Sequence, residues 1–262
     1  MSNDAVLFER RGRIAIITIN RPEAMNAINA QVWAEMGYAL EEYARDTTLW
    51  CAIITGAGER SFCAGADLKA LSRGEQIVPQ EGEHWGFAGV VKHYIKKPII
   101  AAVNGFALGG GTEIALACDL IVASEKASFG LPEVKRGILA GAGGLLRLPR
   151  QIPLKIALEC ILTGEPLTAA EAKNWGLVNR VVPHEKVVEE AIALAEKICE
   201  NAPLAVSASK DIVYRGLDVS LDHPGEAWEI NDGYSNQVMK WEDSMEGVKA
   251  FAERRQPVWQ GR

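Results

Sequence analysis

A short apolar stretch, a turn of small residues and a helical pattern follow one another three times, and this repeat most constrains the fold. The three units begin with WCAIITG (50–56), KPIIAAVNG (97–105) and DLIVAS (119–124). Buried β-rich stretches that alternate with helices are typical of α/β folds with parallel strands. Two of the turns, in FCAGADL and FALGGG, consist largely of alanine and glycine. We therefore expect another group to approach the backbone closely at these turns.

The segments on either side of these units have simpler patterns. VLFER and IAIITIN alternate around Arg11–Gly12 and predict a hairpin. Helical spacing after Asn29, a capping residue, predicts an amphipathic helix that ends at Arg45. The loop-like stretch 72–89 is compatible with a substrate-binding loop and equally with a mobile surface loop. After Pro153 the pattern is mainly helical, and the last predicted helices are 185–200, 204–215, 226–240 and 242–254.

The last three predicted helices have too little sheet around them to belong to the same core. We therefore predict two regions, a core of residues 1–202 and a helical region of residues 203–262. This second region is expected to pack on the core or on other subunits. A chain of 262 residues is long enough for such an arrangement.

Charge and cysteine usage disfavour several classes of protein. The formal charge is −6, from 28 basic and 34 acidic residues, and this disfavours a general nucleic-acid or anionic-membrane binder. The N-terminal stretch MSNDAVLFERRGR lacks the apolar segment of a signal peptide, so we expect a soluble, cytoplasmic protein. Five scattered cysteines without a CxxC pair and four distant histidines argue against a disulfide framework and a metal site. We expect most of the cysteines to lie in the core.

The stretch ALGGGTE, residues 107–113, places three glycines before a carboxylate. It has the spacing neither of a P-loop nor of a GxGxxG dinucleotide motif, and the apolar helical pattern after it excludes a linker. What remains is a strand-to-helix turn. Its unpaired N–H groups lie at the positive end of a helix and can hold an oxyanion. The alternative is that the glycines only allow the helix to pack closely.

Two glutamates, Glu113 and Glu133, lie in apolar sequence surroundings. A buried carboxylate is unfavourable unless it is paired or takes part in chemistry. Two carboxyl groups that flank one site can hold a water molecule and share the roles of general base and general acid. Taken singly, each glutamate is also compatible with a surface or capping role.

Four motifs, in order and at matching spacing, resemble the crotonase (enoyl-CoA hydratase/isomerase) superfamily. They are ITINRPEAMNAI, FCAGADLK, AVNGFALGGGTEIALACDLIVASEKASFGLPEV and LTGEPLTAAEAKNWGLVNRVVP. Within this family, ITGAGE, GFAG, GLLRLP and FAERRQPVWQGR most resemble carnitinyl-CoA dehydratases, which are also crotonobetainyl-CoA hydratases. The resemblance implies an α/β spiral of repeated ββα units and a C-terminal helical trimerisation region. It also implies a homotrimer or a dimer of trimers.

The resemblance also implies a set of site residues. The backbone N–H groups of Ala66 and Gly110 correspond to the oxyanion hole for the thioester carbonyl of an acyl-CoA. Glu113 and Glu133 correspond to the two catalytic glutamates of hydratases, of which the first activates water for attack at C3 and the second protonates C2. Gly141 corresponds to a glycine whose N–H helps to hold that water, although Ala140 replaces the usual proline before it.

The CoA moiety is expected to contact the segment Ala64, Ala66, Asp67, Leu68 and Lys69, and Phe251 and Arg254 in the C-terminal tail. The implied reaction is reversible hydration of a 2-enoyl-CoA through a thioester enolate. No metal is expected, and no cofactor other than the coenzyme A that the substrate carries. Neither a nucleic acid nor a membrane is an expected partner.

Three alternatives to a fatty enoyl-CoA hydratase stay open at this point. One is a crotonobetainyl-CoA enzyme, whose quaternary ammonium substrate favours an aromatic pocket, for which Trp85, Phe87 and Tyr94 are candidates. Another is an enoyl-CoA isomerase that uses Glu133 alone, although the presence of both glutamates favours hydration. The third is a non-catalytic CoA-binding or RNA-binding homologue.

Overall fold

The larger of two β-sheets forms the centre of the fold. A computed structural model describes residues 4–79, 81–222 and 225–262 of the chain. The strands of this sheet lie in the order β1-β2-β3-β5-β7-β10, and every neighbouring pair is parallel except the β1/β2 hairpin. Their bounds are β1 Val6–Arg11, β2 Ile14–Ile19, β3 Cys51–Gly56, β5 Ile99–Val103, β7 Leu120–Ser124 and β10 Arg180–Val182. The predicted hairpin and parallel α/β sheet are thus confirmed.

The smaller sheet consists of very short strands in the order β4-β6-β8-β9. Their bounds are β4 Ser61–Cys63, β6 Phe106–Leu108, β8 Ser128–Gly130 and β9 Leu167–Thr168. Each repeat sends its first strand to the larger sheet and its second to the smaller one, which gives the pairs β3/β4, β5/β6 and β7/β8. This confirms the ββα spiral that the family resemblance implied.

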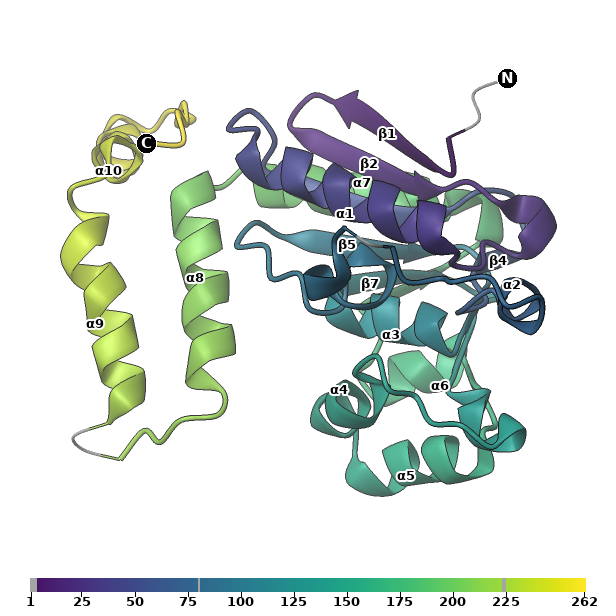
Figure 1. The fold of residues 1–262 in the computed structure, drawn as a ribbon. Helices are drawn as coiled ribbons and strands as arrows, with labels where there is room; N and C mark the ends of the chain where they lie inside the picture. The colour runs from purple at the N-terminus through teal and green to yellow at the C-terminus, as the bar shows by residue number, and fades with distance from the viewer. Residues whose placement is uncertain (1–3, 80, 223–224) are drawn as a thin grey trace.

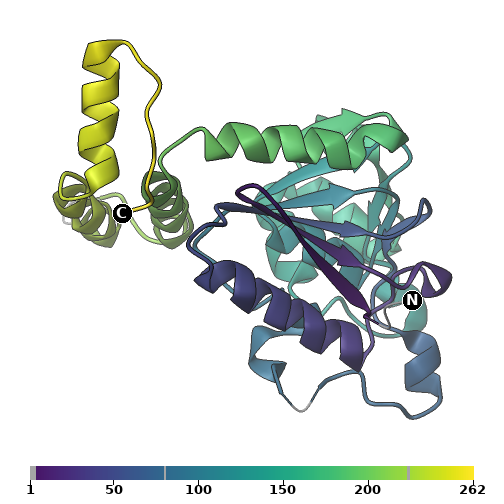
Figure 2. The same ribbon diagram turned by 90° about the horizontal axis from the view of Figure 1, so that it is seen from above.

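Helices cover both faces of the larger sheet (Figure 1, Figure 2). Because side chains alternate along a strand, Ile14, Ile16, Ile53 and their neighbours pack against α7 on one face. The other face packs against α1 and joins the core around the smaller sheet and α3. Four cysteines are buried in these cores as free thiols, as expected. The helices of this part are α1 Ala30–Arg45, α2 Leu68–Ser72, α3 Gly110–Ala117, α4 Gly144–Gln151, α5 Leu154–Thr163, α6 Ala169–Asn174 and α7 Val187–Cys199.

The C-terminal end of the loop predicted at residues 72–89 packs on α1. It contains two short 3-10 turns, η2 Glu83–Trp85 and η3 Phe87–Gly89. Gly89 lies so close to the helix that a Cβ at this position would be 2.5 Å from the backbone nitrogen of Gly37. The side of the loop that carries Phe87 is therefore held against a rigid element. Further 3-10 turns are η1 Pro22–Ala24, η4 Pro132–Arg136 and η5 His184–Lys186.

The last three helices extend away from the core as an arm (Figure 1, Figure 2). They are α8 Pro203–Gly216, α9 Glu226–Val238 and α10 Glu242–Glu253, close to the predicted bounds. Polar contacts fasten α8 to the core. The Nζ of Lys210 lies 2.7 Å from Oδ2 of Asp119, and the hydroxyl of Tyr94 donates to Asp211 at 2.9 Å. The helical content is confirmed, whereas the regional boundary at residue 202 and the role in oligomerisation stay predictions.

Candidate active site

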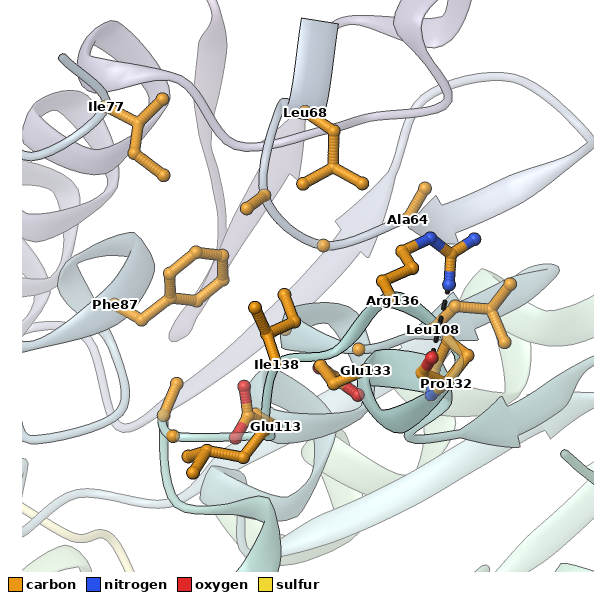
Figure 3. Close-up of a pocket in the computed structure, with 17 residues that line it drawn as sticks. Ala64, Leu68, Ile77, Phe87, Leu108, Glu113, Pro132, Glu133, Arg136 and Ile138 are labelled. Atoms are coloured by element: carbon orange, nitrogen blue, oxygen red, sulfur yellow. Dashed lines mark hydrogen bonds between the residues drawn. The ribbon is translucent and has the colours of Figure 1, made fainter. Parts of the chain in front are cut away.

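A cavity of about 360 Å³ lies where the ends of β4 and β6 meet η4 and the start of α4 (Figure 3). It contains both glutamates, Glu113 and Glu133, and the glycine-rich turns that precede α2 and α3. Most of the side chains that line it are apolar, namely Leu68, Ile77, Phe87, Leu108, Pro132, Ile138 and Leu139, and one wall carries Arg136. The cavity therefore combines an apolar wall with a small number of polar groups, which is typical of a small-molecule site.

Two backbone N–H groups at this cavity, those of Ala66 and Gly110, have no acceptor within the described ranges. The bonds from Ile28 N–H to Gly65 O (2.8 Å) and from Asp67 N–H to Ile28 O (2.9 Å) leave the N–H of Ala66 between them unused. Gly110 is the first residue of α3, where intrahelical acceptors are missing. Neither N–H finds an acceptor among the residues that the structure describes. A Cβ at Gly65 would lie 3.0 Å from the nitrogen of Gly110, so the two turns touch and their donors are neighbours.

The three glycines of the second turn each allow a close approach. At Gly111 a Cβ would overlap the carbonyl oxygen of Cys63, and at Gly110 it would overlap the ring of Phe87. Gly109 has φ +56°, and a Cβ there would be 2.8 Å from Oε1 of Glu133. The glycines thus permit close packing, which leaves Gly110 at the cavity, and the oxyanion-holding role of its N–H stays a prediction.

Glu113 is buried on α3, with 3% of its surface exposed. Its Oε1 accepts a hydrogen bond from the N–H of Gly144 at 2.8 Å. Burial raises the pKa of Glu113 to about 7, the Gly144 hydrogen bond opposes this rise, and the nearby charge of Glu133 adds to it. Because Glu113 is buried, a surface role is excluded, whereas its hydrogen bond with Gly144, the first residue of α4, is a capping contact to that helix.

Glu133 lies on η4, and its carboxyl group shares the cavity with that of Glu113 (Figure 3). Burial raises its pKa, while the positive charge of Arg136 lowers it. Its Oε2 is buried and, within the described part of the chain, has no hydrogen-bond partner. Burial thus favours the neutral form of both groups, and their mutual repulsion disfavours the state in which both are ionised. Such a pair suits proton transfer near neutral pH.

The N–H of Gly141, which was predicted to hold water, instead donates to a backbone carbonyl group. Gly141 lines the cavity, but its N–H donates to the carbonyl oxygen of Leu139 at 2.9 Å. A backbone N–H that donates to Glu113 is that of Gly144, three residues further along. Sequence reasoning missed Gly144, for which the only signal was its place in the glycine-rich stretch GAGG. The water-holding role of Gly141 stays a prediction.

Only part of the predicted CoA-binding segment, residues 64–69, lines the cavity. Ala64, Ala66 and Leu68 line the cavity, whereas Asp67 and Lys69 are not among the lining residues. The carboxylate of Asp67 caps α2 through the N–H of Ala70 and pairs with Arg21, both at 3.0 Å. Lys69 is exposed on α2. In this structure the side chain of Asp67 therefore orders the turn that carries Ala66.

The two predicted CoA-binding residues of the tail lie outside this cavity. Phe251 is 87% exposed on α10, and Arg254 caps the end of that helix with φ +54°. The arm places α10 away from the part of the core that holds α2 and α3 (Figure 1). One chain therefore does not bring these residues to its own cavity, and their contact with CoA stays a prediction.

Of the three aromatic residues considered for a quaternary ammonium pocket, Phe87 lines the cavity. Trp85 is buried and stacks on the ring of His93, with 5.2 Å between the ring centroids. Tyr94 instead donates to Asp211 of α8. The structure therefore supplies one aromatic side chain at the cavity wall, and no aromatic cage from these three.

The described ranges contain neither a cluster of metal-binding side chains nor a membrane-spanning helix. Within residues 4–79, 81–222 and 225–262, no group of three or more His, Cys, Asp or Glu side chains is arranged to hold a metal ion. In the same ranges, no helix has the length and apolar character that a membrane span requires.

The spiral of ββα units, with neighbouring N–H donors and two glutamates at one cavity, is the arrangement that the resemblance to the crotonase superfamily implied. The enoyl-CoA hydratase/isomerase family matches residues 9–262, and the chain belongs to this family. It is 44% identical to the carnitinyl-CoA dehydratase of Proteus mirabilis (strain HI4320) over 257 residues, which are 96% of this chain and 97% of that protein. It is 45% identical to the carnitinyl-CoA dehydratase of Salmonella typhimurium over 264 residues, which are 99% of this chain and 100% of that protein.

Solved structures agree with this family membership. The carnitinyl-CoA hydratase of Mycobacterium avium is 56% identical to this chain, with a TM-score of 0.80 and full coverage of both chains. The enoyl-CoA hydratase of Mycobacterium tuberculosis H37Rv is 47% identical, with a TM-score of 0.93, and the match covers 99% of this chain and 100% of that one. The resemblance to the family and its fold is thus confirmed.

Proposed function

We propose that this protein is an enoyl-CoA hydratase, a hydro-lyase that reversibly adds water across the C2=C3 bond of a 2-enoyl-CoA. The observation that carries the proposal is the pair of buried Glu113 and half-buried Glu133, next to the N–H groups of Ala66 and Gly110, which have no acceptor in the described part of the chain. An isomerase needs one proton shuttle, whereas addition of water needs a base for the water and an acid for carbon. Two carboxyl groups in one cavity provide both.

The proposed reaction uses each of these groups once. The thioester oxygen accepts hydrogen bonds from the N–H groups of Ala66 and Gly110. Ionised Glu113 takes a proton from water as the oxygen bonds to C3, and the electron pair of the double bond moves toward the thioester oxygen. Protonated Glu133 then gives its proton to C2, which collapses the enolate. Each oxyanion-hole donor stabilises the transition state by about 3 kcal/mol, and proton exchange between the two carboxyl groups restores the starting state.

The apolar lining favours a hydrocarbon acyl group. Leu68, Ile77, Ile138 and Leu139 supply apolar surface, whereas a quaternary ammonium group is best bound by several aromatic faces. Arg136 also lines the cavity and would repel such a cation. The second candidate substrate, crotonobetainyl-CoA or its hydrated form carnitinyl-CoA, is favoured by the names of relatives that are 44–56% identical to this chain.

The adenine end of the CoA and the assembly of the protein complete the proposal. Ala64, Ala66 and Leu68 lie where the pantetheine arm enters, and no cofactor beyond the CoA of the substrate takes part. The C-terminal helical arm, α8–α10, exposes large apolar side chains, with Leu217 at 71% and Phe251 at 87% exposure. Such surfaces are typical of contact sites. We therefore propose a trimer or a dimer of trimers, in which Phe251 and Arg254 reach the CoA of another copy, and a cytoplasmic location.

A panel of thioesters tests the substrate class. We expect the purified protein to hydrate crotonyl-CoA and longer 2-enoyl-CoAs, because their acyl groups match the apolar wall. The loss of enoyl-thioester absorbance measures the rate, and crotonobetainyl-CoA is assayed in parallel. A rate confined to crotonobetainyl-CoA would establish the second candidate. Absence of turnover with every member of the panel, at high protein concentration, would contradict a hydratase.

A further inference from the structure

The guanidinium of Arg147 contacts the backbone of two segments near the cavity, one at Val91 and the other at Gly143. It lies in the first turn of α4 and is partly buried. Its Nη2 donates to the carbonyl oxygen of Val91 at 2.7 Å. Its Nη1 lies directly over Gly143, so that a Cβ there would overlap it. Among the described residues, no carboxylate oxygen lies within 4.0 Å of its guanidinium. Its contacts are thus to backbone, and its charge is not neutralised by an ion pair.

The turn under Arg147 is the one that holds Glu113. Gly143 has φ +106°, a conformation that strongly favours glycine. The next residue, Gly144, donates its N–H to Oε1 of Glu113. The backbone N–H of Arg147 donates to the carbonyl oxygen of Gly143 at 2.8 Å. Arg147 therefore contacts this turn through its main chain and its side chain.

The charge of Arg147 shifts the pKa of Glu113 in the direction opposite to that of Glu133. The ionisable groups that act on Glu113 are Glu133 from η4, whose charge raises its pKa, and Arg147 from α4, whose charge lowers it. Around Arg147 itself, a second cavity contains several charged or titratable groups, and Asp119 among them already pairs with Lys210. These groups are Lys92, His93, Tyr94, Asp119, Arg150, Lys210, Tyr214 and Asp218.

We propose that Arg147 is a positioning residue for the base Glu113. Its guanidinium fixes the Gly143–Gly144 turn so that the N–H of Gly144 meets the carboxylate, and its charge favours the ionised form of Glu113 over the neutral one. The hydrogen bond to Val91 ties the same cation to the segment that follows η3, whose Phe87 lines the cavity. The kinetic part of this inference rests on the proposed hydratase function, whereas the ionisation of Glu113 can be measured without a substrate.

The first readout is the pH dependence of stability in Arg147→Met, Arg147→Lys and the control Arg150→Met. Arg150 lies on the same helix, is 63% exposed at its side chain and is close to Asp218. In each background the stability of the chain is compared with that of its Glu113→Gln derivative. The folded pKa of Glu113, about 7, is above its ordinary value of 4.5. The chain with Glu113 therefore loses stability relative to its Glu113→Gln derivative as the pH rises from 4.5 to about 7. Above the folded pKa this difference in stability becomes constant, and the pH at which it does so is the levelling pH.

We expect Arg147→Met to move the levelling pH upward, because removal of a neighbouring cation raises the pKa of a carboxyl group. Arg147→Lys keeps the charge and is expected to leave the levelling pH in place, while its single ammonium cannot span the turn and Val91 together. Arg150→Met should behave as the parent. The proposal is overturned if Arg147→Met leaves the levelling pH unchanged, or if Arg147→Lys or Arg150→Met shifts it as far. If Arg147→Met does not fold, Arg147→Gln takes its place.

The second readout is the pH profile of crotonyl-CoA hydration. We expect the rise of kcat/KM with pH to move upward in Arg147→Met and activity to recover at higher pH, whereas Arg147→Lys loses kcat several-fold with its midpoint unchanged. A loss in Arg147→Met that is equal at every pH contradicts the charge role. Failure of the parent chain to turn over crotonyl-CoA would contradict the proposed function instead, and the stability readout would still decide the role of Arg147.

Discussion

Replacement of Glu113 by glutamine is expected to lower kcat for crotonyl-CoA hydration by about 10²–10⁴-fold, the usual contribution of a general base. Glutamine has nearly the same shape as glutamate. Its carbonyl oxygen can still accept the hydrogen bond that the N–H of Gly144 donates to Oε1 of Glu113 in the parent protein. It cannot take a proton from water. KM is expected to change little, because Ala66 and Gly110 still bind the thioester. Steady-state kinetics of the purified variant measure both constants.

Two further variants make this result specific. Glu125→Gln removes a carboxylate from an exposed position outside the cavity and is expected to keep the parent rate. Glu133→Gln is expected to abolish exchange of the C2 proton of butyryl-CoA with deuterated water, whereas Glu113→Gln retains part of this exchange. Hydration by Glu113→Gln at near the parent rate would contradict the two-glutamate account and favour an isomerase that uses Glu133 alone.

Substitution of Gly65 by alanine is expected to lower kcat by about 10²–10³-fold, the usual effect of losing one oxyanion-hole donor. The added methyl carbon would lie 3.0 Å from both the nitrogen of Gly110 and the carbonyl oxygen of Leu108. It would therefore cover the N–H of Gly110, on which the developing negative charge depends. Kinetics with crotonyl-CoA, together with a folding check by circular dichroism, measure the effect.

Gly176→Ala is a matched control for backbone strain in this experiment. Gly65 has φ +89° and Gly176 has φ +85°, but a Cβ at Gly176 would have no heavy atom within 4 Å. Both variants therefore place alanine in a left-handed conformation, which costs about 1–2 kcal/mol, and only Gly65→Ala approaches the donor. Equal loss of activity in the two variants would show that strain, and not the covered N–H, is responsible.

Periodicity predicted the long elements of this fold well and the short ones poorly. The amphipathic pattern from Asn29 to Arg45 and the helices after residue 185 carry several turns of repeated apolar positions, and α1 and α7–α10 lie where expected. Strands such as β4 and β8 have three residues each, too few for an alternating pattern to be visible. The second sheet was therefore anticipated only through the family resemblance.

Residue type predicted the acids of the site, whereas backbone donors gave little signal. Glu113 and Glu133 stood out because carboxylates are rare in apolar stretches, yet their proximity depends on the spiral that brings α3 and η4 together. Gly144 acts through its N–H, which every residue except proline has, so its place in GAGG said nothing of its partner. The CoA contact of Asp67 stays a prediction, and the pairing of its carboxylate with Arg21, 46 positions away in the sequence, is a contact that only the fold reveals.

Hydration of crotonyl-CoA in water labelled with oxygen-18 and deuterium tests the central claim most directly, because the two-glutamate mechanism takes the C3 hydroxyl from water and the C2 proton from a carboxyl group that exchanges with solvent. Mass spectrometry of the product is predicted to show one labelled oxygen at C3 and one solvent-derived deuterium at C2. Glu113→Gln, assayed alongside, should form this product at a small fraction of the parent rate. Migration of the double bond without uptake of labelled oxygen by the parent protein would contradict the account.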